Sequence, residues 1–435
     1  MGDVLNFKCP CCGAPLTFNG SEGEMVCEYC DAHFTMEQAR EAQEAEKENA
    51  AASDMTWTTK EQQLIQGEDG KVKGYLCSLC GAEMVADENT AATECPYCGN
   101  QAIIPSSFNG MYQPELVIPF AIDKAKATAS LKEFTKGKKL LPKSFTNGNR
   151  IQDMTGLYVP FWLYSCHAEG SVSFEGVKSK KWEDQNYTYE KKDHYHLVRS
   201  GAMDFERIPA DASTKMDDAT MDSLEPYDLS KGVPYDAAYF SGYLCDRYDV
   251  QEEDAQPRAN DRVINTFRAK MKETVRDYSE VKQKSESIRL SNAKAEYAML
   301  PVWMMSTKYE DKVYTFGING QNGKMVGSLP VDMGKYYKFL ALATAISMAL
   351  MQMIIYYLGN HTFTAKAEII AFVISLIIGF FYAQGLKASM NTIAQKHSAT
   401  GYIVDHSFKV GRPVDRFLYS KTEKREKLKQ TSRNT

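Results

Sequence analysis

The sequence predicts a multidomain protein in which two small cysteine-rich modules precede an α+β middle domain and a C-terminal transmembrane helical hairpin. Three observations lead to this fold class: a cysteine quartet that occurs twice, a pair of related proline–tryptophan segments, and two long runs without charge. The 435 residues leave room for about two or three domains. The predicted boundaries are 1–35 and 71–104 for the cysteine modules, 36–70 for an acidic helical linker between them, 115–335 for the middle domain, 336–387 for the hairpin and 388–435 for a basic cytoplasmic tail.

Each cysteine module has the pattern Cys-x2-Cys, fourteen further residues, and a second Cys-x2-Cys. Four thiolates at this spacing form a closed tetrahedral cage around one Zn²⁺ ion and leave no position for a substrate. We therefore predict two four-cysteine zinc ribbons that hold two structural zinc ions, without a catalytic role for the metal. The predicted ligands are Cys9, Cys12, Cys27 and Cys30 in the first ribbon and Cys77, Cys80, Cys95 and Cys98 in the second.

Glycine follows the second thiol in three of the four Cys-x2-Cys pairs and permits the positive φ that a tight knuckle needs. Two other ligands are considered. Cys11 could replace Cys12, but only Cys12 matches the repeat, and His33 lies three residues after the first quartet. Disulfides are the alternative interpretation of the quartets, and they would require an exported chain. The N-terminus has no basic-then-apolar signal pattern, which favours zinc.

The middle domain contains two related segments, V-P-F-W-L at 159–163 and L-P-V-W-M at 300–304. A helix is predicted before each segment, at 123–136 and 261–284, and a hairpin after each. This repetition indicates an α+β domain built from two related halves. We expect the prolines at sheet edges or bulges, because proline lacks a ladder donor, and we interpret Trp162 and Trp303 as core anchors.

Apolar and alternating runs predict the strands of the middle domain. Residues 156–164 form a buried strand with 171–177 as its hairpin partner, and 178–206 form a half-exposed strand or hairpin. His194 and His196 point to one side of that strand and could bind a metal, but no third ligand is evident. Cys166 and Cys245 are isolated and are expected to pack as small hydrophobic residues. Further strands are expected at 116–120, 299–306, 312–317 and 324–331.

Two uncharged runs, 339–358 and 369–386, are each about long enough to cross a hydrocarbon layer as a helix. A buried helical hairpin of a soluble protein is the alternative. Lys335 and Lys338 precede the first run, Lys387 and Lys396 follow the second, and the connecting loop contains only Lys366. This bias predicts a multi-pass protein of the cytoplasmic membrane with both termini in the cytoplasm. A cytoplasmic N-terminus also suits reduced cysteines.

Charge is distributed unevenly along the chain. Residues 1–110 contain eighteen acidic and six basic residues, a net charge of −12, and each zinc tetrathiolate would add about −2. Phosphate backbones should be repelled by such a module, so we expect protein partners rather than nucleic acid. From Lys387 onward there are eleven basic and four acidic residues, a net charge of +7, beside the anionic leaflet. Within this tail, 421–429 is interpreted as a solvated helix or a lipid-facing anchor, with a merely solvated tail as the alternative.

Motifs of the common enzyme classes are absent from the sequence. The nearest approach to a phosphate-binding loop, at 317–324, has one residue too many between its glycines and ends at Met325 instead of a hydroxyl residue. No nucleophile elbow or H-E-x-x-H helix occurs, and the two runs contain no charged residue for a proton or ion pathway. We therefore predict no enzymatic activity, with no catalytic and no cofactor-binding residues besides the zinc ligands.

Several segments together resemble a bacterial family known as TFIIB-type zinc ribbon-containing proteins. The resemblance covers most of the chain and is carried by FKCPCCGAPL, GYLCSLCGAEM, LVIPFAIDKAKA, GLYVPFWLY, AMLPVWMM and DRFLYSKTEKR. Members are sometimes labelled primosomal or helicase-like through their ribbons, but this chain has no motor motif. Some relatives resemble membrane partners in envelope-stress systems built around phage-shock-protein-A-like proteins. The resemblance thus implies a role in an envelope-stress response.

These observations favour a non-enzymatic, membrane-anchored zinc-ribbon adaptor that binds cytoplasmic or membrane protein partners. The rival hypothesis is a membrane-tethered nucleic-acid-binding protein associated with replication or a helicase. It predicts salt-sensitive binding of DNA or RNA by the ribbons, which the net charge of −12 in residues 1–110 disfavours. A third hypothesis, a hydrolase or ligase in the middle domain, lacks an identifiable site.

Overall fold

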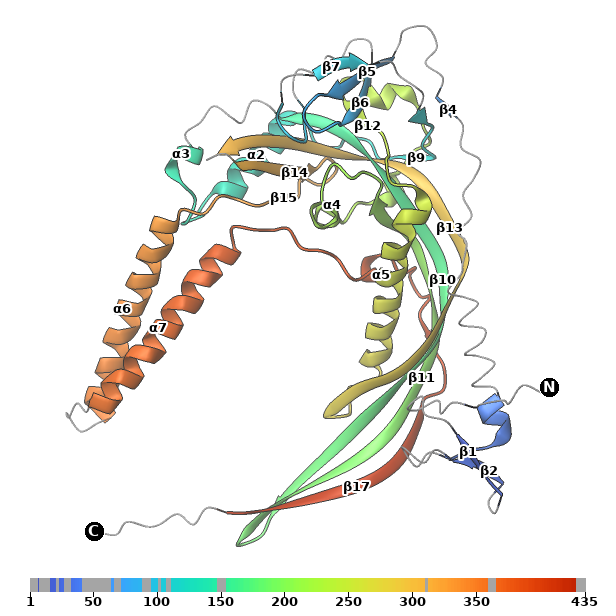
Figure 1. Cartoon of the computed structure of the whole chain (residues 1–435), viewed down its shortest axis with the longest axis vertical. Helices are drawn as coiled ribbons and strands as arrows, with labels where there is room; N and C mark the ends of the chain where they lie inside the picture. The colour runs from blue at the N-terminus through green and yellow to red at the C-terminus, as the bar shows by residue number, and fades with distance from the viewer. Residues whose placement is uncertain are drawn as a thin grey trace.

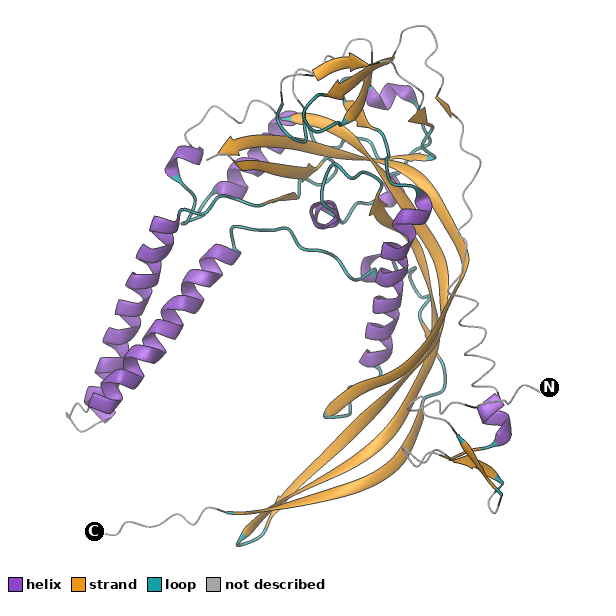
Figure 2. Cartoon of the chain, in the orientation of Figure 1, coloured by secondary structure: helices purple, strands orange, loops and turns teal. Residues whose placement is uncertain are grey.

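The computed structural model is a mixed α/β fold. It describes residues 7, 16–20, 23–26, 33–40, 64–65, 72–87, 95–100, 103–106, 111–146, 154–309, 312–358 and 365–427. Most strands in these ranges belong to one sheet of twelve strands, which runs from the second ribbon through the middle domain to residues after the hairpin. Figure 2 shows this sheet as one curved surface, with the helices beside it.

The first ribbon is described only in part. Its short strands β1 (Thr17–Asn19), β2 (Glu24–Val26) and β3 (His33–Phe34) form a separate antiparallel sheet over a small cluster that includes Phe7 and Met25. The predicted ligands Cys9, Cys12, Cys27 and Cys30 lie outside the described residues, as does most of the linker 36–70. In that linker, β4 (Leu64–Ile65) pairs with β8 (Met111–Tyr112).

Four long strands form the body of the large sheet. They are β10 (Thr155–Glu183), β11 (Tyr187–Asp211), β13 (Glu280–Tyr309) and β17 (Val414–Glu426), antiparallel in the order β17-β11-β10-β13. The prediction that 171–177 is a hairpin partner is wrong, because this segment continues β10 and the partner is β11. The predicted half-exposed hairpin at 178–206 is confirmed. Figure 1 shows the four strands curving together along the molecule.

Two facing glycines lie near the middle of the long strands. Gly170 in β10 is opposite Gly201 in β11. A Cβ on Gly170 would lie 2.1 Å from the carbonyl oxygen of Ser287, and one on Gly201 would lie 2.4 Å from that of Lys409. Glycine is therefore required here by close backbone approach, and not by a turn.

The two P-x-W segments have equivalent surroundings. In each half a short strand, a helix, a long strand and a hairpin strand follow one another, and the long strands pair with Val159 opposite Leu300. Each short strand pairs in parallel with the long strand of the other half. These are the relations expected of a duplicated unit. The elements are β9 (Leu116–Val117), α2 (Lys124–Thr135), β10 and β11 in one half, and β12 (Leu244–Asp246), α5 (Glu252–Glu273), β13 and β14 (Lys312–Asn319) in the other.

The tryptophans and prolines of these segments extend the correspondence. Trp162 and Trp303 are buried core anchors, as predicted, and each indole N–H donates to the carbonyl two residues before the helix of the other half, at Val250 and Ile122. Both prolines lie in interior strands, not at the edges or bulges that we expected. Their carbonyls accept from Ala212 and Gly320, just past the ends of β11 and β14. Each proline, which has no N–H to donate, therefore lies opposite a residue just beyond the end of the neighbouring strand.

Helix boundaries follow local signals. Asp123 caps α2, since its carboxylate accepts from the amide of Lys126 at 2.8 Å. Helix α5 begins nine residues before the predicted start at 261 and ends at Glu273, while 280–284 belong to β13. Acidic residues in its first turn and lysines in its last turn complement the helix dipole. Short elements complete the middle domain: α3 (Lys143–Thr146), α4 (Asp218–Leu224), η2 (Leu229–Lys231), η3 (Ala237–Phe240) and β15 (Met325–Gly327).

Two apolar helices, α6 (Met333–Leu358) and α7 (Ala365–Ala388), are long enough to cross a membrane. They run side by side away from the sheet (Figure 1). In the most apolar 18-residue stretch of each helix, only 6% of the residues of α6 and 22% of those of α7 are buried. The core hairpin of a soluble protein would be mostly buried. A stripe of small residues on α7 faces α6, and a Cβ on Gly379 would lie 2.1 Å from Oγ1 of Thr344. The buried members of this stripe are Ala371, Ser375, Gly379 and Ala383.

The chain after α7 returns to the middle domain. It passes through η4 (Thr400–Tyr402) and β16 (Lys409–Val410) into β17, which pairs with β11 along most of its length. The expectation of a helix or a free tail at 421–429 is therefore wrong for 421–426, which form the end of β17. Because both ends of the hairpin enter the same fold, α6 and α7 are an insertion in the middle domain.

Candidate metal centre

The second ribbon places its cysteines on two similar knuckles. Cys77 ends β5 (Val72–Cys77), which pairs with β6 (Glu83–Asp87) and β7 (Ile103–Ser106). The amide of Cys77 donates to Ala82 and the amide of Gly81 donates back to Cys77, both at 2.9 Å. Cys95 has the same pair of bonds with Asn100 and Gly99, also at 2.9 Å. Gly81 and Gly99 have φ values of +71° and +69°, as the sequence predicts.

The four sulfurs of this ribbon converge on one point. All ligand atoms of Cys77, Cys80, Cys95 and Cys98 lie within 4.8 Å of one another. The Sγ atoms of Cys77 and Cys98 are 3.6 Å apart, as are those of Cys80 and Cys95. A zinc tetrathiolate with bonds of about 2.3 Å has sulfur–sulfur separations of about 3.8 Å. The cluster therefore has the size and donor set of a structural zinc site.

Burial and hydrogen bonds affect the four thiols differently. Cys77 and Cys95 are 1% exposed, whereas Cys80 is at the surface. Burial opposes ionisation of Cys77, but the amides of Cys80 and Leu79 and the Asn100 side chain lower its pKa to about 6. Burial raises the pKa of Cys98 to about 11 and that of Cys95 further. Because the pKa values of Cys95 and Cys98 are raised, all four thiols become thiolates only when a cation binds between them. This dependence on a cation is typical of a metal site.

The second ribbon is joined to the middle domain by strand pairing. Cys245 and Asp246 of β12 lie opposite Val85 and Met84 of β6, so the sheet continues from the middle domain into the ribbon. The apolar side chains of the two units also form one cluster, in which Met84 of the ribbon packs with core residues of the middle domain such as Leu157. The ribbon is therefore part of the same folded body.

Polar contacts fasten the second knuckle to the sheet. Ser306 Oγ lies 2.9 and 2.8 Å from the carbonyl oxygens of Pro96 and Tyr97. The Tyr97 hydroxyl donates to the fully buried carboxylate of Asp246, which also accepts from Ser213 Oγ at 2.6 Å. Burial raises the pKa of Asp246 to about 6. Sequence reasoning missed Asp246 and Ser306, because nothing local relates them to a knuckle 149 and 210 residues away.

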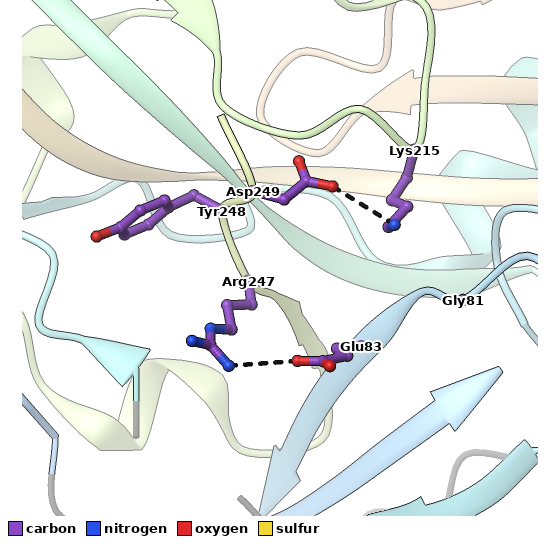
Figure 3. Close-up of a pocket in the computed structure, with 6 residues that line it drawn as sticks. All are labelled: Gly81, Glu83, Lys215, Arg247, Tyr248 and Asp249. Carbon is purple, nitrogen blue, oxygen red and sulfur yellow. Dashed lines mark hydrogen bonds and ion pairs between the residues drawn. The ribbon is translucent and has the colours of Figure 1, made fainter. Parts of the chain in front are cut away.

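A polar cavity of about 350 Å³ lies beside this junction (Figure 3). Arg247 reaches Glu83 of the ribbon at 3.3 Å, and Lys215 reaches Asp249 at 3.4 Å. Each cation that lines the cavity is thus matched by a carboxylate. The cavity is a polar seam of the docking interface, and its paired charges offer no excess charge to a ligand.

The other candidate ligands do not form a site among the described residues. His33 Nδ1 lies 3.1 Å from Oε2 of Glu24. His194 stacks on Tyr419 with ring centroids 4.4 Å apart, and burial lowers the pKa of His196. Cys166 and Cys245 are buried, as predicted. In the described ranges, only the quartet of the second ribbon groups three or more side chains with metal-binding geometry. Cys11 lies outside these ranges, as does the first quartet.

The fold and the site thus define a mixed α/β protein with a four-cysteine cluster fitted to a metal ion and two helices that could cross a membrane. The chain is 31% identical over 353 residues to a protein of Bacillus subtilis (strain 168) that bears the name "Uncharacterized protein YdjG". The alignment covers 80% of this chain and 98% of that protein, so the chain belongs to the YdjG family. No protein-family model matches the chain, and no solved structure matches it significantly.

Proposed function

We propose that this chain is a non-enzymatic, membrane-anchored adaptor that binds cytoplasmic or membrane protein partners. The observation that carries the proposal is the continuity of the sheet from β6 of the second ribbon through β12 to β10 and β11, and on to β17. The hairpin is an insertion in the same body. A partner bound to the sheet would therefore be held at a defined position relative to the membrane.

The attachment of the hairpin supports its role as the anchor. The amide of Asp332, before α6, donates to Leu140, and the amide of Leu329 donates to Met390 just after α7, both at 2.9 Å. Both ends of the hairpin are thus fixed to one folded unit, which has to remain on one side of the membrane. The lysine bias favours the cytoplasmic side, so the protein is proposed to be multi-pass with both termini in the cytoplasm.

Zinc is proposed to act in this protein as a structural element. The geometry of the second ribbon supports one ion, and the identical spacing of Cys9, Cys12, Cys27 and Cys30 supports a second. A closed tetrathiolate leaves no open position for substrate. The metal would thus stabilise the two knuckles and, through Tyr97 and Ser306, the junction with the sheet.

The outer edge of β17 is the surface proposed to bind the partner. In the part of the chain that the structure describes, β17 forms ladder pairs with β11 alone, and Arg416 at its start also donates to the carbonyl of His33 in β3 at 3.1 Å. Phe417 and Tyr419 are about half exposed on this strand. A free strand edge can accept an extended segment of a partner, and the flanking lysines and arginines limit indiscriminate pairing. Asp415 is held by Arg199 and Tyr278, which fixes the start of the strand.

Affinity capture of the full-length protein tests the proposal. A chain truncated after residue 335 is unsuitable for this experiment. It would lack β17 and the residues near Ser398 that contact α5. Phe417→Asp should lower recovery of the protein partner at least tenfold. Val313→Asp on β14 is the matched control, since the two side chains are 51% and 50% exposed. Equal recovery of the partner by both variants would count against β17 as the binding surface. Failure to recover any protein partner, at any salt concentration, would count against the adaptor function.

The resemblance to membrane partners in phage-shock-protein-A-type systems supports a role in envelope stress. Deletion of the gene should then alter the induction of stress proteins after membrane damage, and an unchanged response would exclude this role. The nucleic-acid hypothesis is tested by the same capture experiment: recovered DNA or RNA that is lost at high salt would favour it.

A further inference from the structure

A lysine-rich segment of the middle domain lies at the root of the hairpin. Residues 124–146 contain seven lysines and one glutamate. Lys138 Nζ donates to the carbonyl of Ser389, directly after α7. Lys139 Nζ lies 3.4 Å from the hydroxyl of Tyr382 and 5.7 Å from the ring centroid of Phe339, so it contacts both apolar helices. Figure 1 shows α2 and α3 next to the start of α6.

The hairpin adds its own lysines to this region. Lys335 and Lys338 lie in the first turns of α6, where a cation opposes the helix dipole, and Lys387 lies in the last turn of α7. Lys335 Nζ donates to the carbonyl of Leu141 at 2.5 Å, which joins two segments 194 residues apart. We define the lysine collar as Lys138, Lys139, Lys143, Lys335, Lys338 and Lys387.

A cavity of about 490 Å³ opens at the collar, lined by Lys143, Lys335 and Tyr309 among others. Asp332 is the acidic residue in its lining, and this carboxylate accepts from the amide of Lys335 at 3.0 Å as the cap of α6. Two lysines of the collar, Lys143 and Lys335, therefore line this cavity against one carboxylate. Met333, the first residue of α6, lines the cavity and is 44% exposed, and exposed apolar side chains continue along α6 from Tyr337.

We propose that the lysine collar binds the phosphate groups of anionic phospholipids in the cytoplasmic leaflet. The proposal rests on the membrane-anchored function above. The ligand is a lipid, not a soluble phosphate, because cationic groups and a tyrosine adjoin two apolar helices whose outer faces match acyl chains. Each lysine close to an anionic bilayer surface strengthens binding about fivefold.

Membrane topology alone does not account for the collar. The positive-inside bias counts lysines within about twenty residues of a span, which includes Lys335, Lys338 and Lys387. Lys138, Lys139 and Lys143 are far outside that window in sequence and reach the hairpin only through folding. Their position at its root therefore points to contact with the lipid headgroups.

Lipid retention by the full-length protein tests the collar. Protein solubilised in detergent is equilibrated with equal amounts of phosphatidylglycerol and phosphatidylcholine, repurified, and its bound lipids are counted by mass spectrometry. Wild type should retain phosphatidylglycerol over phosphatidylcholine by at least tenfold. The variant K138Q/K139Q/K143Q should lose this preference, and K138R/K139R/K143R should keep it. The control K180Q/K282Q/K294Q removes the same charge from exposed lysines on β10 and β13 and should behave as wild type.

Equal retention of the two lipids by wild type, or equal loss in the collar and control variants, would overturn the proposal. Displacement of phosphatidylglycerol by excess glycerol 3-phosphate would also overturn it, since the ligand would then be a soluble phosphate. Carbonate extraction of native membranes separates this failure from failure of the anchor. A protein that stays in the membrane without a lipid preference refutes only the collar, whereas an extracted protein refutes the membrane anchor as well.

Discussion

A buried ion pair holds the segment after the hairpin to the middle domain, and its removal gives a quantitative test of the fold. Glu225 is 1% exposed, and its carboxylate accepts from both terminal nitrogens of Arg262 at 3.0 and 2.8 Å. Lys396 Nζ and the Tyr402 hydroxyl reach the same carboxylate at 3.3 and 2.7 Å. One side chain thus links the end of α4, helix α5 and the chain that returns from α7.

The substitution Glu225→Gln keeps the shape of the side chain and removes its charge. It leaves Arg262 and Lys396 close together without their shared counter-charge. The carboxylates of Asp211 and Asp222 do not replace it, because both already pair with Arg258. Removing one partner of a buried ion pair destabilises a protein by about 3–5 kcal/mol. With about 2–4 °C per kcal/mol for a domain of this size, Tm should fall by about 10 °C.

Thermal unfolding of the full-length protein in detergent, followed by tryptophan fluorescence, measures this change. Glu133→Gln is the control, since Glu133 and its partner Lys136 are both 75% exposed, and it should leave Tm within about 2 °C of wild type. The double variant E225Q/R262M should recover part of the loss, because it also removes one unpaired cation. A Tm for Glu225→Gln within about 2 °C of wild type would refute the packing of the returning segment against α5.

Three further changes test the metal centre, its junction and the hairpin. Cys95→Ser should lower the zinc content of the purified protein by one equivalent, measured by mass spectrometry of the metal. Burial raises the pKa of Asp246 to about 6, so the folded state takes up a proton more readily than the unfolded state, and stability should fall as pH rises from about 4 to 6. Asp246→Asn should weaken this pH dependence in unfolding experiments, and the remainder is expected from Asp211, because burial raises the pKa of that carboxyl to about 6 as well. Gly379→Ala should destabilise the hairpin by about 2 kcal/mol through contact with Thr344, whereas Gly385→Ala, which meets no atom within 4 Å, should be neutral in the same melting assay.

Local signals in the sequence were sufficient for the knuckles, for helix α2 and for the two apolar helices. The positive φ of Gly81 and Gly99 and the cap at Asp123 are properties of a few neighbouring residues. The burial of Trp162 and Trp303 also follows from the residue type and its apolar neighbours. These predictions agree with the structure because little outside each segment determines them.

Long-range pairing could not be predicted in the same way. Residues 421–426 form a strand although five of their six side chains are charged and most are exposed, so no alternating apolar pattern marks them. Gly170 resembles a turn residue in sequence, yet it lies inside β10, where the backbone of β13 leaves no room for a side chain. Pairing between β6 and β12 depends on two segments about 160 residues apart. Only the folded chain shows that the second ribbon belongs to the sheet.

Site-specific photo-crosslinking in native membranes tests the adaptor most directly. A photoreactive amino acid replaces Phe417 on β17 in the full-length protein, and the same amino acid replaces Val313 as the matched control. The adaptor predicts a discrete protein adduct at position 417 that resists nuclease and is absent at position 313. Adducts that disappear after nuclease treatment would support the nucleic-acid hypothesis, and no adduct at position 417 would contradict partner binding at this strand.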